Sequence, residues 1–82
     1  MIHREYLPHM SKLPTLKPKQ VVKKLQKMGF IIDRQSGSHV ILYDPQTKRR
    51  AVIPIHLSDL KKGTLSAIIR ESGINRDEFL NI

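Results

Sequence analysis

The sequence of 82 residues contains no cysteine and no tryptophan, and only 5% of its residues are aromatic. The absence of cysteine excludes a disulfide framework, thiolate zinc sites and thiol catalysis, as expected for a protein of the reducing cytoplasm. No apolar stretch approaches the length of a membrane span, and the N-terminus lacks the uninterrupted apolar core of a signal peptide. We therefore expect a cytoplasmic protein that does not enter a membrane.

Acidic residues are also scarce, since 7 Asp and Glu oppose 15 Lys and Arg, which gives a formal net charge of +8. Such a charge density attracts polyanions and accelerates encounters with them. Nucleic acid is the expected partner, although an acidic protein would be attracted by the same charge. A membrane-surface binder would need an exposed amphipathic helix with bulky aromatic residues, which are few in this chain.

A chain of this length predicts a single domain that buries about 60% of its extended surface. Its hydrophobic fraction of 39% suffices for one two-layer core. Residues 1–16 contain two prolines and no sustained periodicity, so they predict an extended N-terminal arm. Residues 17–82 are expected to form the folded domain.

The hydrophobic pattern of residues 17–82 predicts an α+β fold. An amphipathic helix is expected from Pro18 to about Met28, because proline suits the first helical position and Gly29 follows as a stop. Three strands rich in β-branched residues and separated by turn signals then predict an antiparallel meander, with the first turn at Ser36-Gly37 and the strands at 30–34, 38–43 and 51–55.

A second helix is expected over about 64–72, ending at Gly73, and Asn75 is expected to cap a short C-terminal helix. The predicted order is therefore helix, three strands, helix and a short last helix. Two helices can cover only one face of a small sheet, so its other face should stay open. Three apolar residues of the C-terminus are expected to close over the core: Phe79, Leu80 and Ile82.

Four histidines invite a metal site, but their positions argue against one. His3 and His9 fall in the expected arm, while His39 and His56 are expected to stand alone on separate strands or loops. No HExxH pattern, paired-carboxylate motif, GxGxxG loop or P-loop is present. We therefore expect neither a metal nor another cofactor.

The segment Lys61-Lys62-Gly63-Thr64 places two ammonium groups just before a helix N-terminus. Unsatisfied N–H groups and the helix dipole favour an anion at such a position. The segment is a candidate phosphate anchor, although lysines are also common on exposed turns.

The tripeptide Gly37-Ser38-His39 sets one imidazole at the start of an apolar run. Imidazole titrates near neutrality and can accept or donate a proton there. RNA supplies its own nucleophile, the 2′-hydroxyl, so an RNase without metal must move protons and offset charge on the phosphate. His39 can fill one proton role, with Arg50, Lys61 or Lys62 offsetting charge. By itself, a single histidine is more often structural, so these residues favour nucleic-acid binding over catalysis.

From about Lys12 to Ile82 the chain resembles the HicA family of toxin endoribonucleases, also called YcfA-like mRNA interferases. The segments that carry this resemblance are, in order, KLPTLKPKQVVKKLQKMGF, RQSGSH, VIPIH and LKKGTLSAIIRESGI. The resemblance implies a fold similar to the double-stranded RNA-binding domain, which agrees with the order of elements predicted above.

The resemblance also implies a function, namely a metal-independent endoribonuclease toxin of a type II toxin–antitoxin system. Such a toxin cleaves mRNA and arrests translation, and His39 of the GSH motif would be its general acid or base. Gly37 would supply a tight turn and Ser38 a hydrogen bond. His56 occupies a second histidine position of the family, with either a packing role or a substrate contact.

The resemblance further places Lys61 and Lys62 where double-stranded RNA-binding domains set basic residues against phosphates. It also implies a partner, because a HicB antitoxin binds over the active surface of these toxins and blocks it. An acidic, folded partner protein is therefore expected alongside RNA.

Two other classes of function are open at this point. The chain could be a non-catalytic RNA-binding module of the same fold, for which His39 is dispensable. It could also be an interaction subunit whose basic surface only docks an acidic protein. If the chain is an RNase, its second proton carrier is open among Tyr43, His56 and a lysine.

Overall fold

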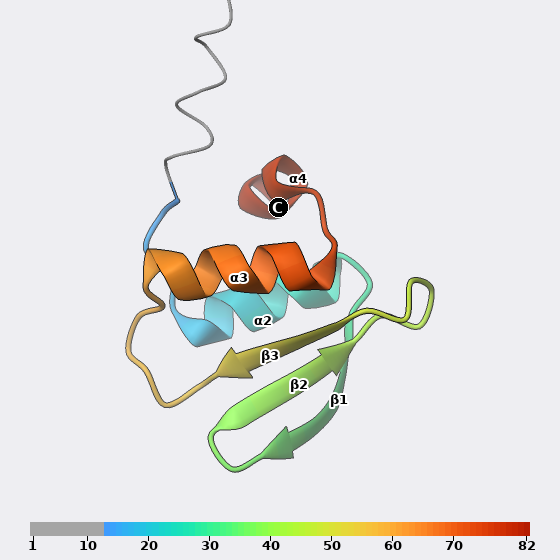
Figure 1. Cartoon of the computed structure of the whole chain (residues 1–82), viewed down its shortest axis with the longest axis horizontal. Helices are drawn as coiled ribbons and strands as arrows, with labels where there is room; N and C mark the ends of the chain where they lie inside the picture. The colour runs from blue at the N-terminus through green and yellow to red at the C-terminus, as the bar shows by residue number, and fades with distance from the viewer. Residues whose placement is uncertain (1–12) are drawn as a thin grey trace, which may run out of the picture.

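The computed structural model describes residues 13–82, so the predictions for residues 1–12, including His3, His9 and most of the arm, lie outside the described part. Six elements follow one another along the chain (Figure 1). Their bounds are α2 Pro18–Lys27, β1 Ile31–Ser36, β2 His39–Tyr43, β3 Arg50–Pro54, α3 Lys62–Ser72 and α4 Arg76–Asn81. This order confirms the predicted α+β fold.

The three strands form one antiparallel sheet in the order β1-β2-β3. The first hairpin turns through two residues, Gly37 and Ser38, and Gly37 has a φ of +59°. A glycine with positive φ at the first central position is typical of the type II′ turns that join twisted antiparallel strands. The predicted turn at Ser36-Gly37 and the predicted end of the first strand at residue 34 were thus misplaced, because β1 continues to Ser36, opposite His39.

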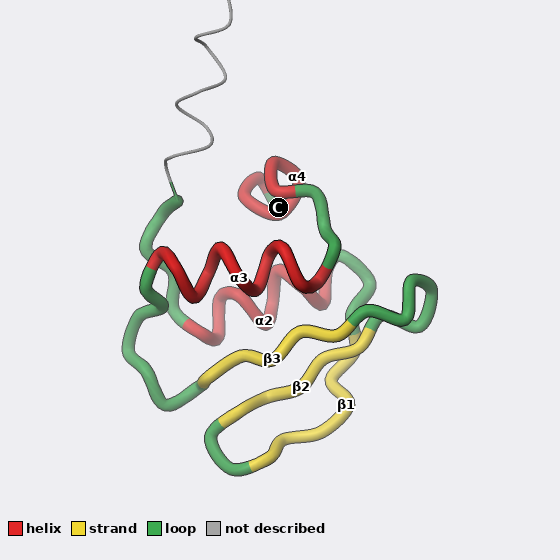
Figure 2. Tube along the Cα trace, viewed as in Figure 1, coloured by secondary structure: helices red, strands yellow, loops and turns green. Residues whose placement is uncertain are grey.

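The helices α2 and α3 lie on the same face of the sheet, and its other face is open, as predicted (Figures 1 and 2). Side chains from both helices, the two strands β2 and β3, and α4 fill the space between the layers. All six residues of β1, an edge strand of the sheet, are exposed. The most deeply buried side chains are Val21, Leu25, Leu42, Ile53, Leu65 and Phe79.

The short helix α4 closes the end of the core through Phe79, which is fully buried. Its N-terminus is capped as predicted, since the backbone N–H of Glu78 donates to Oδ1 of Asn75 at 2.9 Å. Leu80 is half-buried against the core. The prediction for Ile82 was wrong, because this residue follows the last helical residue and is 42% exposed.

A backbone contact joins the segments that lead into α2 and α3. The N–H of Leu60 donates to the carbonyl of Leu16 at 2.9 Å, and both leucine side chains are buried. Leu16 belongs to the expected arm, so the last residues of this arm pack on the domain. Since Lys17 and Lys61 follow directly, the contact sets the N-terminal ends of the two helices side by side.

Alanine substitutions of the two glycines at the ends of α3 are expected to have opposite effects on stability. Gly73 ends the helix with a φ of +70°, and a Cβ there would approach Nε of Arg49 to 3.0 Å. Gly63 lies in the first helical turn, with open space around it. We expect Gly73→Ala to lower the free energy of unfolding by about 1–2 kcal/mol, and Gly63→Ala to raise it by up to about 1 kcal/mol. Urea unfolding of both variants checks this, and changes of the same sign would contradict it.

Candidate functional site

Segments far apart in the sequence meet at one end of the molecule. Figure 1 shows there the β1–β2 turn, the end of β3, the loop over residues 55–61 and the N-terminal ends of α2 and α3. Pairing between β2 and β3 joins the β1–β2 turn to the end of β3, and the bridge between Leu16 and Leu60 joins the N-terminal ends of the two helices. Both histidines of the described chain and the lysine pair of α3 come from these segments.

His39 is the first residue of β2 and is exposed. The next residue, Val40, is buried under the helices, so strand alternation turns the imidazole of His39 toward the open side of the sheet. The carbonyl of Ser38, just before it, accepts a hydrogen bond from the N–H of Ile55 at 2.7 Å. This bond holds the start of β2 against the chain that leaves β3.

His56 follows Ile55 and is also exposed. Its ring centroid lies 6.2 Å from that of His39, and the two ring planes are inclined by 68°. Within residues 13–82, neither imidazole makes a hydrogen bond or an ion pair. The expectation that the two histidines stand alone is therefore wrong. The β2–β3 register sets His39 opposite Pro54, and His56, two residues after Pro54, comes to lie beside His39.

The lysine pair stands at the start of α3, where Lys61 is the N-cap residue and Lys62 the first helical residue. No side chain caps this end, and its first turn contains no acidic residue. The positive end of the helix dipole and two exposed ammonium groups thus coincide, an arrangement that favours an anion. The N-terminal end of α2 lies beside it and has no acidic residue in its first turn either.

Arg50 is not brought together with these residues. It lies opposite Tyr43, four residues along β2 from His39, a separation of about 13 Å at the usual rise of a strand. Its Nη1 donates to Oδ2 of Asp33 at 3.0 Å, and its guanidinium lies 4.7 Å from the centroid of the Tyr43 ring. The structure therefore places Arg50 in a separate cluster at the other end of the open face.

Sequence reasoning missed an apolar hollow beside the site. It has a volume of about 370 Å³ and lies between α2 and the inner side of β1. No sequence signal pointed to it, because its wall combines residues of α2, β1 and β2 that only the fold brings together. Val40 and Ile55, each next to a histidine in the sequence, contribute to its wall, and the full lining is Lys19, Val22, Lys23, Ile32, Val40 and Ile55.

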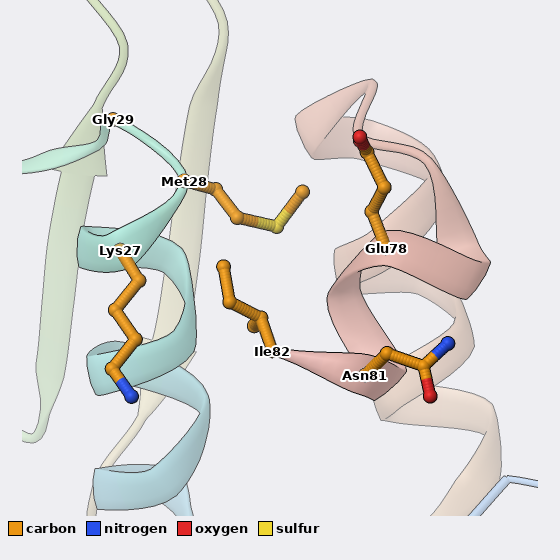
Figure 3. A pocket seen from close by; sticks show the side chains of 6 residues that line it. All are labelled: Lys27, Met28, Gly29, Glu78, Asn81 and Ile82. Carbon is orange, nitrogen blue, oxygen red and sulfur yellow. The ribbon is translucent and has the colours of Figure 1, made fainter.

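A second hollow of about 660 Å³ lies between the C-terminal end of α2 and α4 (Figure 3). Lys27, Met28 and Gly29 form one side, and residues of α4 with Ile82 form the other. It is at the opposite end of α2 from the two histidines. Nearby, Lys24 is used structurally, since its Nζ donates to the carbonyl of Phe79 at 3.2 Å.

In residues 13–82, no three side chains of the metal-binding types His, Cys, Asp and Glu converge. In the same part of the chain, no helix is both long and apolar enough to cross a membrane.

Comparison with known proteins assigns the chain to a protein family. A search among curated proteins found no match. A family model described as the HicA toxin of bacterial toxin–antitoxin systems matches residues 18–74. This span runs from the first residue of α2 to just beyond α3, and it includes His39, His56 and the lysine pair. Because the match covers more than half of the chain, the chain belongs to the HicA family of bacterial toxins.

Proposed function

We propose that this toxin is a metal-independent endoribonuclease that cleaves mRNA and so arrests translation. The observation that carries the proposal is the imidazole pair of His39 and His56, exposed 6.2 Å apart at the same end of the fold as the lysine pair of α3. An imidazole near neutrality can take the proton of a 2′-hydroxyl or protonate a leaving oxygen. RNA supplies the nucleophile, so the protein needs only proton transfer and charge stabilisation.

In this proposal, His39 is the general acid or base, and its neighbours position the strand that carries it. Gly37 allows the tight turn, and Ser38 fixes the start of β2 through its backbone bond to Ile55. Lys61 and Lys62, at the uncapped start of α3, hold a phosphate of the RNA near the histidines. Arg50 lies on the open face of the sheet and contacts another phosphate further along the RNA chain.

The alternative is a non-catalytic RNA-binding module of the same fold. The exposed, uncapped α3 N-terminus favours it equally, because binding to phosphate does not require the histidines. The two proposals differ in their requirement for His39, which only the nuclease needs.

The first test of the proposal replaces His39 by alanine. We expect cleavage of an end-labelled RNA in excess EDTA to fall at least about 100-fold, since general acid–base catalysis contributes on this scale, while RNA binding is unchanged. Cleavage and binding are measured in the same samples, with Gln46→Ala in the distant β2–β3 turn as the control. Normal cleavage by His39→Ala would contradict the proposal, and binding without cleavage by the unmodified protein would favour the RNA-binding module.

A second test concerns the phosphate anchor. We expect the double variant Lys61→Ala/Lys62→Ala to bind RNA more weakly and to lower the slope of log K against log salt by about 1.4, the value for two contacts on single-stranded RNA. Lys27→Ala, at the other end of α2, should retain the normal slope. Binding titrations over a range of salt concentrations measure it. Failure of the unmodified protein to bind RNA even at low salt would instead support a subunit that only docks an acidic protein.

We further propose that a HicB-like antitoxin inhibits this toxin by covering the end that carries the histidines. The net charge of +8 attracts an acidic partner. The neighbouring hollow adds an apolar anchor point framed by Lys19 and Lys23, and buried apolar anchors dominate the energy of protein interfaces. Among the residues that line the hollow, Ile32 belongs to β1, and it is 49% exposed.

Two adjacent residues of β1 test this surface. Ile32 lies opposite Leu42 and lines the hollow, whereas Ile31 lies opposite Tyr43 on the open face. We expect Ile32→Glu to weaken binding of the cognate antitoxin at least about tenfold, or about 1.4 kcal/mol, and Ile31→Glu to have a much smaller effect. Calorimetric titration measures the affinities. Equal losses for both variants would exclude the hollow as the anchor.

A further inference from the structure

We propose that His56 is the second proton carrier of RNA cleavage, acting with His39 as an acid–base pair. The inference rests on the proposed endoribonuclease function and extends it by a residue for which the sequence left a packing role and a substrate contact open.

The two imidazoles are held at a working distance by the backbone. The N–H of Ile55 donates to the carbonyl of Ser38 at 2.7 Å, and each of these residues adjoins one of the histidines. The resulting separation of the ring centroids is 6.2 Å. A proton moves between groups about 2.6–3.2 Å apart, so a phosphodiester that enters beside two rings 6.2 Å apart can place a different oxygen of the same phosphorus within reach of each ring.

The surroundings of His56 leave its ring available for contact with a substrate. The residue is exposed, and its imidazole makes no hydrogen bond or ion pair with any residue of the described chain 13–82. A helix-capping or packing histidine would be buried or bonded. Its ring faces that of His39 in an edge-to-face arrangement.

The other candidates for the second proton fit less well. Tyr43 lies about 13 Å along β2 from His39 and stacks under the guanidinium of Arg50, so it cannot share a phosphate with that histidine. Lys61 and Lys62 stand at the uncapped start of α3, where their ammonium groups are suited to offsetting charge on a phosphate.

The reaction balances with these two residues alone. One imidazole, neutral at the start, takes the proton of the 2′-hydroxyl while the 2′-oxygen forms a bond to the adjacent phosphorus. The bond from phosphorus to the 5′-oxygen breaks, and the other ring, initially an imidazolium, gives its proton to this oxygen. The products are a 2′,3′-cyclic phosphate and a free 5′-hydroxyl, and the two rings have exchanged protonation states, which solvent then restores.

The experiment measures the pH dependence of kcat/KM for the full chain, with His39→Ala, His56→Ala and the neighbouring exposed control Leu57→Ala. Each protein acts on an ordinary RNA and on the same RNA with sulfur in place of the 5′-bridging oxygen. A thiolate leaves without a proton, so the sulfur substrate makes the general acid dispensable.

We expect a bell-shaped profile for the unmodified protein, with both histidine variants at least about 100-fold slower on ordinary RNA. Each variant should lose a different limb of the bell, and the sulfur substrate should restore only one of them, which identifies the acid. The Leu57→Ala control should behave as the unmodified protein, and thermal unfolding should show that all variants are folded.

Three outcomes would overturn the inference. If His56→Ala cleaves within about threefold of the unmodified protein while His39→Ala does not, the endoribonuclease stands and His56 is not its partner. If His56→Ala is slow but retains both limbs, or if the sulfur substrate restores neither variant, His56 binds substrate without carrying a proton. If the unmodified protein cleaves neither substrate, the proposed function itself fails.

Discussion

The antiparallel register between β2 and β3 is the constraint on which the rest of the site depends. It sets His39 opposite Pro54, and the bond from Ile55 to Ser38 extends the pairing by one further step. Because side chains alternate between the two faces, a slip of one residue would bury His39 and expose Val40. The apolar residues of β2 therefore specify, through their burial, the position of an imidazole that contributes nothing to the core.

The small size of the domain explains the apolar surface next to the site. Two helices suffice to cover β2 and β3 but leave β1 exposed, and the hollow lined by Ile32 lies where their cover ends. At the C-terminus, by contrast, the fully buried Phe79 closes the core, and Lys24 donates to its carbonyl.

The sequence predicted what depends on local pattern and missed what depends on pairing across the sheet. The helices ended where glycines can adopt positive φ, so Gly29 and Gly73 marked their ends correctly. The first turn was misplaced by one residue, because Ser36 and Ser38 flank Gly37 symmetrically and only strand pairing distinguishes them. The exposure of Ile82 could not be deduced from its apolar side chain, since only the packing of α4 shows that Phe79 is its fully buried residue.

The same distinction applies to the candidate site. Single positions with a local motif, such as the start of β2 and of α3, could be selected from the sequence. The proximity of His56 to His39, and the separation of Arg50 from both, required the register of β3.

The exposure of both imidazoles bears on how such a toxin is controlled. No side chain of the described residues 13–82 bonds to either ring, so nothing within this part of the fold holds the pair in an inactive state. Under the proposed mechanism, control has to come from a molecule that covers the end of the fold where the rings lie. Under the same proposal, Lys19 and Lys23 beside the hollow would attract an acidic partner, and the apolar hollow would slow its departure. An antitoxin bound in this way would compete with RNA through apolar contacts as well as charge.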